Sequence, residues 1–313
     1  MPEARPLEEA LAEARRKYRN WGRWGPEDVF GTLNFIDAAK REQAAGLARH
    51  GRAFALALEF NRDGPRSGDR GRGNHIHTML DTGEPTPQGF SDAEGMLFMP
   101  LRASTHWDGL GHIADRDMAW NGRPRAKVIT GAGDVVTGVE RQAAAFVSRG
   151  VLLDVGRELA DGELPDGFAI TEEHLRATIA AQGTTVGRGD IVLIRTGQLT
   201  RCRGSGTWDG YSHGPAPGLS FATLGWLHDT EIAAVASDTC GLEVRPHEFD
   251  EPCFAPLHQI AIPNMGLSIG EMFDTDALAR DCAADGVYEF LLVAAGLPIT
   301  GGVGAPVNPV AVK

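Results

Sequence analysis

Apolar positions follow two different periods along the chain, and the two periods alternate. Residues 7–18 carry apolar side chains three and four positions apart, which is the spacing of an amphipathic helix. Short continuous apolar runs predict buried strands instead, as at 151–155, which lies between two glycines, and at 191–197, which follows Gly189. By the same criteria we predict helices at 37–50, 171–181, 221–229 and 276–284, and strands at 53–60 and 232–239.

This alternation of strands and helices continues to the end of the chain without a linker-like change in composition. It therefore predicts one α/β domain over residues 1–313, in which residues 1–50 form a helical N-terminal arm. Residues 61–96 interrupt the pattern, because they are polar and rich in glycine and proline. A connection of this length inside a compact chain is usually functional or mobile.

The composition is that of an ordinary globular protein and excludes several broad classes. Of 313 residues, 42% are hydrophobic and 23% are charged, which excludes a disordered or fibrous protein. The formal net charge of −12 argues against a general nucleic-acid binder, which needs a basic face. We therefore expect a small molecule, and no nucleic acid, as the partner.

Targeting and membrane signals are missing from the sequence. The first 18 residues alternate charge and alanine and contain no apolar core of a signal peptide. The longest apolar stretch, 290–299, is shorter than the ~20 residues that cross a bilayer. The four cysteines are widely spaced without a C-x-x-C pair, so we interpret them as reduced thiols. These features predict a cytoplasmic protein without a membrane partner.

The densest cluster of chemically active side chains is the segment RASTHWDGLGH, residues 102–112. His106 and Asp108 are two positions apart, so on an extended segment both side chains leave the same face. An imidazole and a carboxylate placed in this way are two-thirds of a zinc or manganese site. His112 follows after two glycines, which allow the chain to turn it back as a proton carrier. The alternative is that these histidines are ordinary core or surface residues.

Other histidines and aromatic residues are weaker candidates. His75 and His77 have H-x-H spacing and could approach the site from the long connection, with His77 contacting the substrate, or could be plain surface residues. Trp107 lies inside the cluster and could form an aromatic wall for a substrate, although tryptophans are more often core. The remaining histidines are interpreted as surface residues, namely His50, His174, His213, His228 and His247.

The segment STHWDGLGH resembles the signature of the metal-dependent cyclase family, which includes bacterial kynurenine formamidase and isatin hydrolase. The pattern of that family is His-x-Gly-Thr-His-x-Asp-x-x-x-His. Further segments occur in the family's order, and the resemblance extends from Trp21 to Val312. These segments are WGRWGPEDVFGTLN, RGVLLDV, GDIVLIRTG, PGLS, SDT, the segment around Glu271, and GAPVNPVAV.

The resemblance implies roles for individual residues. His106 and Asp108 take the positions of metal ligands, and His112 that of the catalytic histidine. Family members carry another ligand twelve residues before a C-terminal acid, and counting back from Glu271 gives Gln259. A shift of one residue would give His258 instead, and we favour Gln259. Glu271 itself either orients the site or, with a second metal, becomes a ligand.

Two departures from the family pattern change the expected site. Arg102 replaces the first histidine and Ser104 replaces the glycine. Because the two-zinc site of formamidases uses that first histidine, we expect one divalent ion, Mn²⁺ or Zn²⁺. Arg102 either binds a carboxylate or carbonyl of the substrate or forms a salt bridge.

The resemblance implies a swivelling β/β/α fold and a metal-dependent amidohydrolase. The expected reaction opens a C–N bond of a cyclic or aryl amide with metal-activated water. The alternatives are a polyketide-type cyclase or dehydratase, in which the metal polarises a ketone, and a non-catalytic small-molecule-binding protein. The resemblance also implies a homodimer or homotetramer, in which residues 21–25 or 61–96 of a neighbouring subunit complete the pocket.

Overall fold

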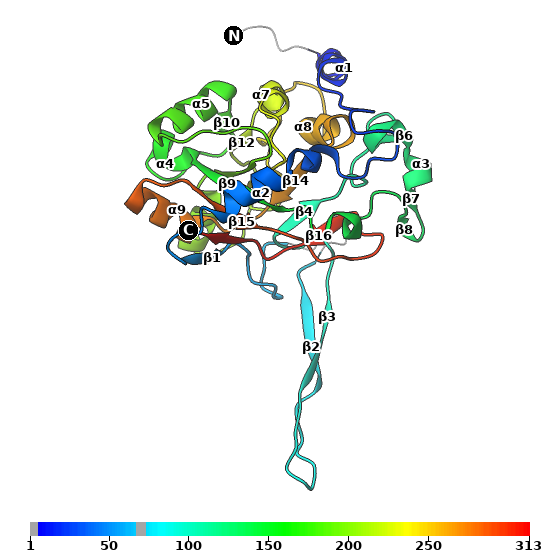
Figure 1. The fold of residues 1–313 in the computed structure, drawn as a ribbon, viewed down its shortest axis with the longest axis vertical. Helices are drawn as coiled ribbons and strands as arrows, with labels where there is room; N and C mark the ends of the chain where they lie inside the picture. The colour runs from blue at the N-terminus through cyan, green and yellow to red at the C-terminus, as the bar shows by residue number, and fades with distance from the viewer. Residues whose placement is uncertain (1–5, 67–72) are drawn as a thin grey trace.

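The computed structural model describes residues 6–66 and 73–313, which fold around one nine-stranded sheet (Figure 1). Four central strands are parallel, in the order β9-β11-β13-β14, and antiparallel strands extend both edges. The complete order is β1 (Ala53–Ala55), β17 (Val310–Val312), β15 (Glu289–Val293), β9 (Val147–Asp154), β11 (Ile191–Arg195), β13 (Ala234–Ser237), β14 (Ser268–Glu271), β4 (His106–Asp108) and β16 (Gly304–Pro306).

Helices cover both faces of this sheet, which is why its central strands are continuously apolar. Alternate residues of β11 enter two different cores, Val192 on one face and Leu193 on the other. The first core includes side chains of α1 (Leu7–Lys17), α4 (Val155–Ala160), α5 (Glu172–Ala181), α7 (Leu224–Asp229) and α8 (Pro256–Ile260). The second core includes side chains of the 3-10 helix η1 (Gly31–Phe35) and of α9 (Asp276–Asp285).

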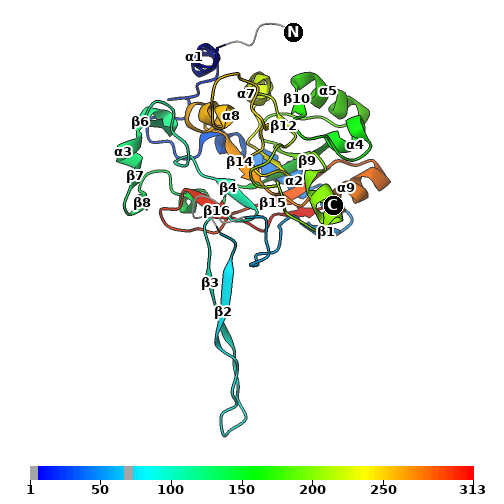
Figure 2. The same cartoon turned by 180° about the vertical axis from the view of Figure 1, so that it is seen from behind.

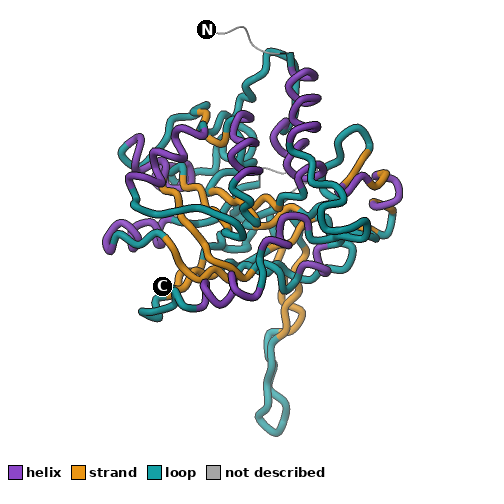
Figure 3. The backbone as a smooth tube through the Cα atoms, turned by 45° about the horizontal axis from the view of Figure 1, so that its top comes forward, coloured by secondary structure: helices purple, strands orange, loops and turns teal. Residues whose placement is uncertain are grey.

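The remaining elements are short, and Figure 3 shows how helices and loops surround the strands. They comprise α2 (Ala38–Ala45), α3 (Arg125–Val128), α6 (Gln198–Ser205), the 3-10 helices η3 (Trp120–Gly122), η4 (Val139–Gln142) and η5 (Phe221–Thr223), and the π-helix η6 (Ala261–Met265). Three two-stranded sheets join β5 (Met118–Ala119) to β6 (Arg123–Pro124), β7 (Ile129–Thr130) to β8 (Gly133–Asp134), and β10 (Ala169–Ile170) to β12 (Gly218–Leu219).

A two-stranded hairpin projects far from the body and forms an arm (Figures 1 and 2). Its strands are β2 (Ile76–Asp81) and β3 (Glu94–Phe98), which pair in antiparallel fashion and are exposed throughout. The arm occupies most of the predicted long connection 61–96, of which residues 67–72 lie outside the described residues. The two chain segments at its base carry Arg66 and Arg102.

The predicted α/β class and the helical N-terminal segment agree with the structure, and the helices predicted at 171–181 and 276–284 differ from α5 and α9 by one residue. The helix predicted at 37–50 ends earlier, at Ala45, where Gly46 follows. The strand predicted at 53–60 stops at Ala55, where its three-residue pairing with β17 ends. The domain bounds themselves stay a prediction. No helix within residues 6–66 and 73–313 is long and apolar enough to cross a membrane.

Candidate metal centre

Two antiparallel strands, β4 and β14, bring three ionisable side chains together at the centre of the molecule. Glu271 pairs with His106 across the ladder, so the two side chains leave the same face of the sheet. Asp108 lies two residues beyond His106 and therefore shares that face. One potential ligand atom from each of these three buried residues lies within 4.8 Å of the others.

His106 is oriented as a nitrogen ligand. Its Nδ1 lies 2.7 Å from the carbonyl oxygen of Ser104, which can only accept, so Nδ1 carries the hydrogen and donates it. The Nε2 lone pair consequently faces the carboxylates, 3.5 Å from Asp108 Oδ1 and 3.6 Å from Glu271 Oε2. A backbone carbonyl that fixes the tautomer in this way is a common partner of metal-bound histidines.

Two atoms at this centre are left without a hydrogen-bond partner among the described residues. They are His106 Nε2 and Asp108 Oδ2, and both are buried. Leaving buried polar atoms unpartnered is costly unless another group satisfies them. An imidazole nitrogen and carboxylate oxygens are the donors that zinc and manganese accept, so the residues fit a divalent ion.

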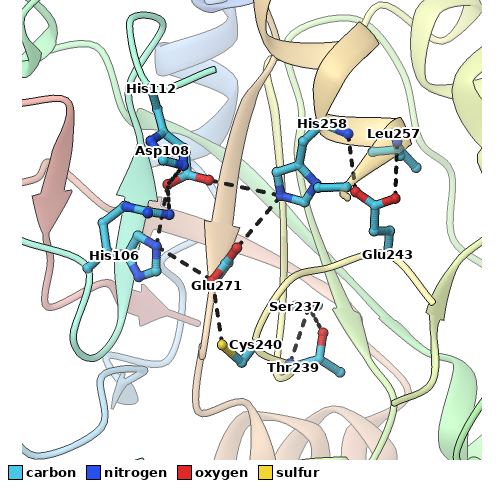
Figure 4. Close-up of polar contacts among 12 residues, drawn as sticks. His106, Asp108, His112, Ser237, Thr239, Cys240, Glu243, Leu257, His258 and Glu271 are labelled. Carbon is cyan, nitrogen blue, oxygen red and sulfur yellow. Dashed lines mark hydrogen bonds and ion pairs between the residues drawn. The ribbon is translucent and has the colours of Figure 1, made fainter. Parts of the chain in front are cut away.

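His258 of α8 reaches the same centre from the opposite side (Figure 4). Its Nε2 lies 3.9 Å from Asp108 Oδ2 and 3.6 Å from Glu271 Oε1. Glu243 fixes the ring from behind, because its Oε1 lies 2.5 Å from His258 Nδ1. The same carboxylate accepts the backbone N–H groups of Leu257 and His258 in the first turn of α8, so it also caps the helix.

Neighbouring groups of opposite charge stabilise the ionised forms of the side chains at the centre. Burial alone would raise the pKa of the Glu271 carboxyl, but His258 and His106 outweigh it, and the pKa falls to about 2. Burial likewise opposes protonation of His258, yet Glu243 and Glu271 raise its pKa to about 10. The pKa of Asp108 lies well below its ordinary value, because His112 and Arg102 outweigh its burial. The two carboxylates are therefore ionised at neutral pH.

His112 lies beside this cluster but is not part of it. Its Nε2 is 3.9 Å from Asp108 Oδ1, and its side chain remains partly accessible from the pocket. Burial lowers the pKa of His112 to about 4, with a further contribution from the charge of Arg102, in spite of the neighbouring Asp108. The imidazole is therefore neutral near pH 7 and can accept a proton.

Asp108, His258 and Glu271 of the cluster line a pocket with a volume of about 200 Å³. A pocket of this size holds only a small organic molecule. Charged side chains line the pocket, and Ile113, Phe254 and Ala255 add apolar surface. The charged lining residues are Arg66, Arg102, Arg245, Asp108, Glu243 and Glu271, together with the histidines His112, His213, His247 and His258.

Residues 54–244 match the model of the family described as putative cyclase. A solved structure described as a novel cyclase is 35% identical, with a TM-score of 0.85, and the alignment covers 99% of this chain and 100% of that one. The chain belongs to the cyclase family. The predicted family and fold are thereby confirmed.

More distant cyclase-family relatives share the fold. Isatin hydrolase A from Ralstonia solanacearum is 18% identical with a TM-score of 0.63, over 88% of this chain and 97% of that one. A predicted metal-dependent hydrolase from Bacillus stearothermophilus is 17% identical with a TM-score of 0.50, over 84% and 98%. A search among curated proteins gives no match.

Gln259, the ligand that the cyclase-family spacing favours, does not face the centre. Its amide nitrogen donates to Asp115 Oδ1 at 2.9 Å, and its neighbour His258 takes the position toward Asp108 and Glu271. The reason lies in η6, because a π-helical turn holds one more residue than an α-helical turn. The extra residue lengthens the interval before Glu271 from twelve residues to thirteen, which selects His258.

Two predicted substrate contacts also lie elsewhere. Trp107 is fully buried on the opposite face of β4, where it packs against Phe146 and Phe273 and donates to the Ala294 carbonyl. The alternation that directs His106 and Asp108 to the pocket directs Trp107 to the core. His77 lies on the exposed arm, in β2. Arg102, by contrast, lines the pocket, and Glu271 lies within the ligand cluster itself.

Several residues at the site were not singled out from the sequence. Glu243 and Cys240 come from the irregular segment after β13, and Arg66 from the base of the arm. His213 and His247, interpreted as surface residues, line the pocket as well. The family block SDT, which ends one residue before Cys240, was the only signal in that segment that could have directed attention to it.

Proposed function

We propose that this protein is a metal-dependent hydrolase that opens a C–N bond of a cyclic or aryl amide. The observation that carries the proposal is the buried group of His106, Asp108, His258 and Glu271, whose facing atoms include two that make no hydrogen bond to any described residue. The fold shared with isatin hydrolase A, a relative that is named for opening such a ring, supports the choice of bond.

The ion would be held by His106 Nε2, by oxygens of Asp108 and Glu271, and by His258 Nε2. A site of two imidazoles and two carboxylates can bind either zinc or manganese. Such an ion supplies Lewis acidity toward a carbonyl and makes water a stronger nucleophile near neutral pH. Ser104 and Glu243 hold the two imidazole rings in the tautomers that keep each Nε2 directed at the ion.

His112 is the residue that moves protons in this proposal. Its low pKa keeps it neutral and able to accept a proton at its Nε2, which lies on the pocket side of Asp108. From there it can return the proton to the nitrogen that leaves when the C–N bond breaks. General acid–base catalysis by one positioned side chain typically contributes 10²–10⁴-fold to the rate.

The test combines metal analysis with an isotope experiment on the purified protein. We expect about one zinc or manganese ion per chain and, with isatin or a formylated aniline as substrate, one solvent oxygen incorporated into the product in ¹⁸O-labelled water. Two ions per chain would contradict the single site. A product formed without solvent oxygen would replace hydrolysis by ring closure or dehydration, and metal binding without turnover of any amide would indicate a binding protein.

A further inference from the structure

We propose that Arg102 makes the pocket selective for substrates that carry a carboxylate on an apolar, aryl-sized body. This inference rests on the proposed function and specifies the substrate class. Three observations carry it. The Arg102 guanidinium has N–H groups that no described residue accepts, the pocket lining contains three arginines, and apolar side chains line the same pocket.

The Arg102 guanidinium is only partly used by the protein. Within residues 6–66 and 73–313 its one hydrogen-bond or ion-pair partner is Asp108, with 3.3 Å between Nη1 and Oδ1. Its Nε and Nη2 groups therefore remain for a ligand, and 17% of the side chain is accessible from the pocket. A guanidinium with two free N–H groups on one edge matches a carboxylate in a bidentate pair.

Two further arginines add positive charge without offering the same contact. Arg66 is buried, and its guanidinium donates to the Arg102 carbonyl and to Cys240 Sγ. The guanidinium of Arg245 donates to the carbonyls of Ser212 and Tyr211. Neutral groups accept the hydrogen bonds of both side chains, and Arg66 Nη2 also lies 3.9 Å from Glu271 Oε2.

The balance of charges favours an anion in the pocket. The positive charges of the three arginines cancel the negative charges of three carboxylates, those of Asp108, Glu243 and Glu271, so these six side chains carry no net charge among themselves. A bound divalent ion would make the pocket positive, even after a proton leaves His258. The surrounding chain has a net charge of −12, so the pocket would be a local positive site in an acidic protein.

The pocket also offers apolar surface to the body of such a ligand. Ile113, Phe254 and Ala255 line the same pocket as Arg102, and Phe254 is 67% exposed. A ligand that places its carboxylate on Arg102 can therefore cover apolar surface with an aromatic or aliphatic body. A purely polar anion would leave that surface in water.

The experiment compares benzoate with its neutral counterpart benzamide, because the two have nearly the same shape. Dissociation constants are measured by ligand-observed NMR, with and without EDTA, for the wild type, Arg102→Gln, Arg102→Lys and the exposed control Arg176→Gln. We expect the wild type to prefer benzoate, and Arg102→Gln to lose about tenfold in benzoate affinity with benzamide unchanged. Arg102→Lys should recover part of the preference, and Arg176→Gln should behave as the wild type.

Equal binding of the two ligands by the wild type would overturn the inference, as would an Arg102→Gln variant that keeps the preference. The EDTA series ensures that a loss of metal in the variant is not mistaken for loss of the carboxylate contact. Failure of the proposed function is recognised separately. A pocket that binds benzoate through Arg102 while no amide is hydrolysed would leave this inference intact, and hydrolysis of amides without any preference for anions would refute this inference alone.

Discussion

The three consecutive residues of β4 have different roles because their side chains point alternately to the two faces of the sheet. His106 and Asp108 face the metal cluster, and Trp107 between them fills the core behind the sheet. The H-x-D spacing was sufficient to place the first two residues together. The same alternation requires the middle residue to lie on the other face, so the burial of Trp107 could also have been predicted from the sequence.

Substitutions of the two motif histidines should separate metal binding from proton transfer. We expect His106→Ala to lose both the metal and the activity, because it removes the ligand nitrogen directed at the ion. His112→Ala should keep the metal and lose about 10²–10⁴-fold in kcat, because the proton acceptor is gone. Elemental analysis and steady-state kinetics on both variants test this. A His112→Ala enzyme with full turnover would show that His112 has another role.

Metal binding should release a proton from His258. In the metal-free protein Glu243 and Glu271 raise its pKa to about 10, so the ring is protonated at pH 7 and must lose that proton to bind an ion. Metal affinity should therefore rise as the pH increases from 7 toward 10. Calorimetry in buffers of different ionisation enthalpy measures the proton, and its absence would contradict the assignment of His258 as a ligand.

The raised pKa of His258 also affects the stability of the metal-free protein. This stability should fall with rising pH, whereas the metal affinity should increase. A group whose pKa is higher in the folded state stabilises that state below its unfolded pKa of about 6.5. This contribution is lost as the pH rises through about 10. Metal-free protein should accordingly become less stable toward alkaline pH, and Glu243→Gln should weaken this dependence because the carboxylate that favours the charged ring is removed.

At the scale of elements, regular segments could be predicted and irregular ones could not. The helix at 171–181 has Thr171 at its N-cap and acids in its first turn, which are local signals. The π turn η6 has no such signal, because its buried residues pack against η3 and β5, which lie about 140 residues earlier in the chain. Gly266, which ends this turn at a φ of 75°, lies against Trp120. His258 could therefore not be distinguished from Gln259 by counting.

Helix α1 is attached to the site region through one buried carboxylate. Arg15 donates to both oxygens of Asp115, at 2.5 and 2.9 Å, and Gln259 and Asn264 donate to the same group. We expect Arg15→Met to destabilise the protein by about 3 kcal/mol, because a buried carboxylate would lose its ionic partner. Urea denaturation measures the change. The exposed neighbour Arg16 provides the control, and an Arg16→Met variant should stay within about 0.5 kcal/mol of the wild type.

At the scale of the whole molecule, the arm is the feature least suited to a monomer. Seven of the fourteen large apolar side chains that are exposed in the described part of the chain lie on it, among them Ile76 and Phe98. An isolated two-stranded hairpin is only marginally stable in water, so such a surface is expected to be covered. The sequence indicated an unusual segment at 61–96 but not its shape, because few contacts with the body specify it.

The occupant that we expect on the arm is a second copy of this chain. Residues 76–98 contain four acids and no lysine or arginine, whereas α3 exposes Arg125 and Lys127 on the body. In a dimer with twofold symmetry the arm of each copy can meet the basic region of the other. The homodimer or homotetramer implied by the family resemblance stays a prediction that this charge complementarity supports.

Light scattering during gel filtration tests that arrangement. We expect a dimer or tetramer for the wild type, a monomer for the double variant Ile76→Ser/Phe98→Ser, and weaker association for Arg125→Glu/Lys127→Glu. Arg176→Glu is the control on an unrelated surface. A monomeric wild type, or an oligomer that survives the substitutions on the arm, would contradict the role of the arm.

The π turn at η6 has a consequence for how sequences of this family are aligned. A π turn accommodates one more residue than an α-helical turn, while the elements on either side keep their places. The spacing between a ligand and a later acid can therefore change without moving the ligand, as it does for His258, which stands thirteen residues before Glu271. A sequence comparison that allows no gap within residues 261–265 would consequently match the wrong residue to His258.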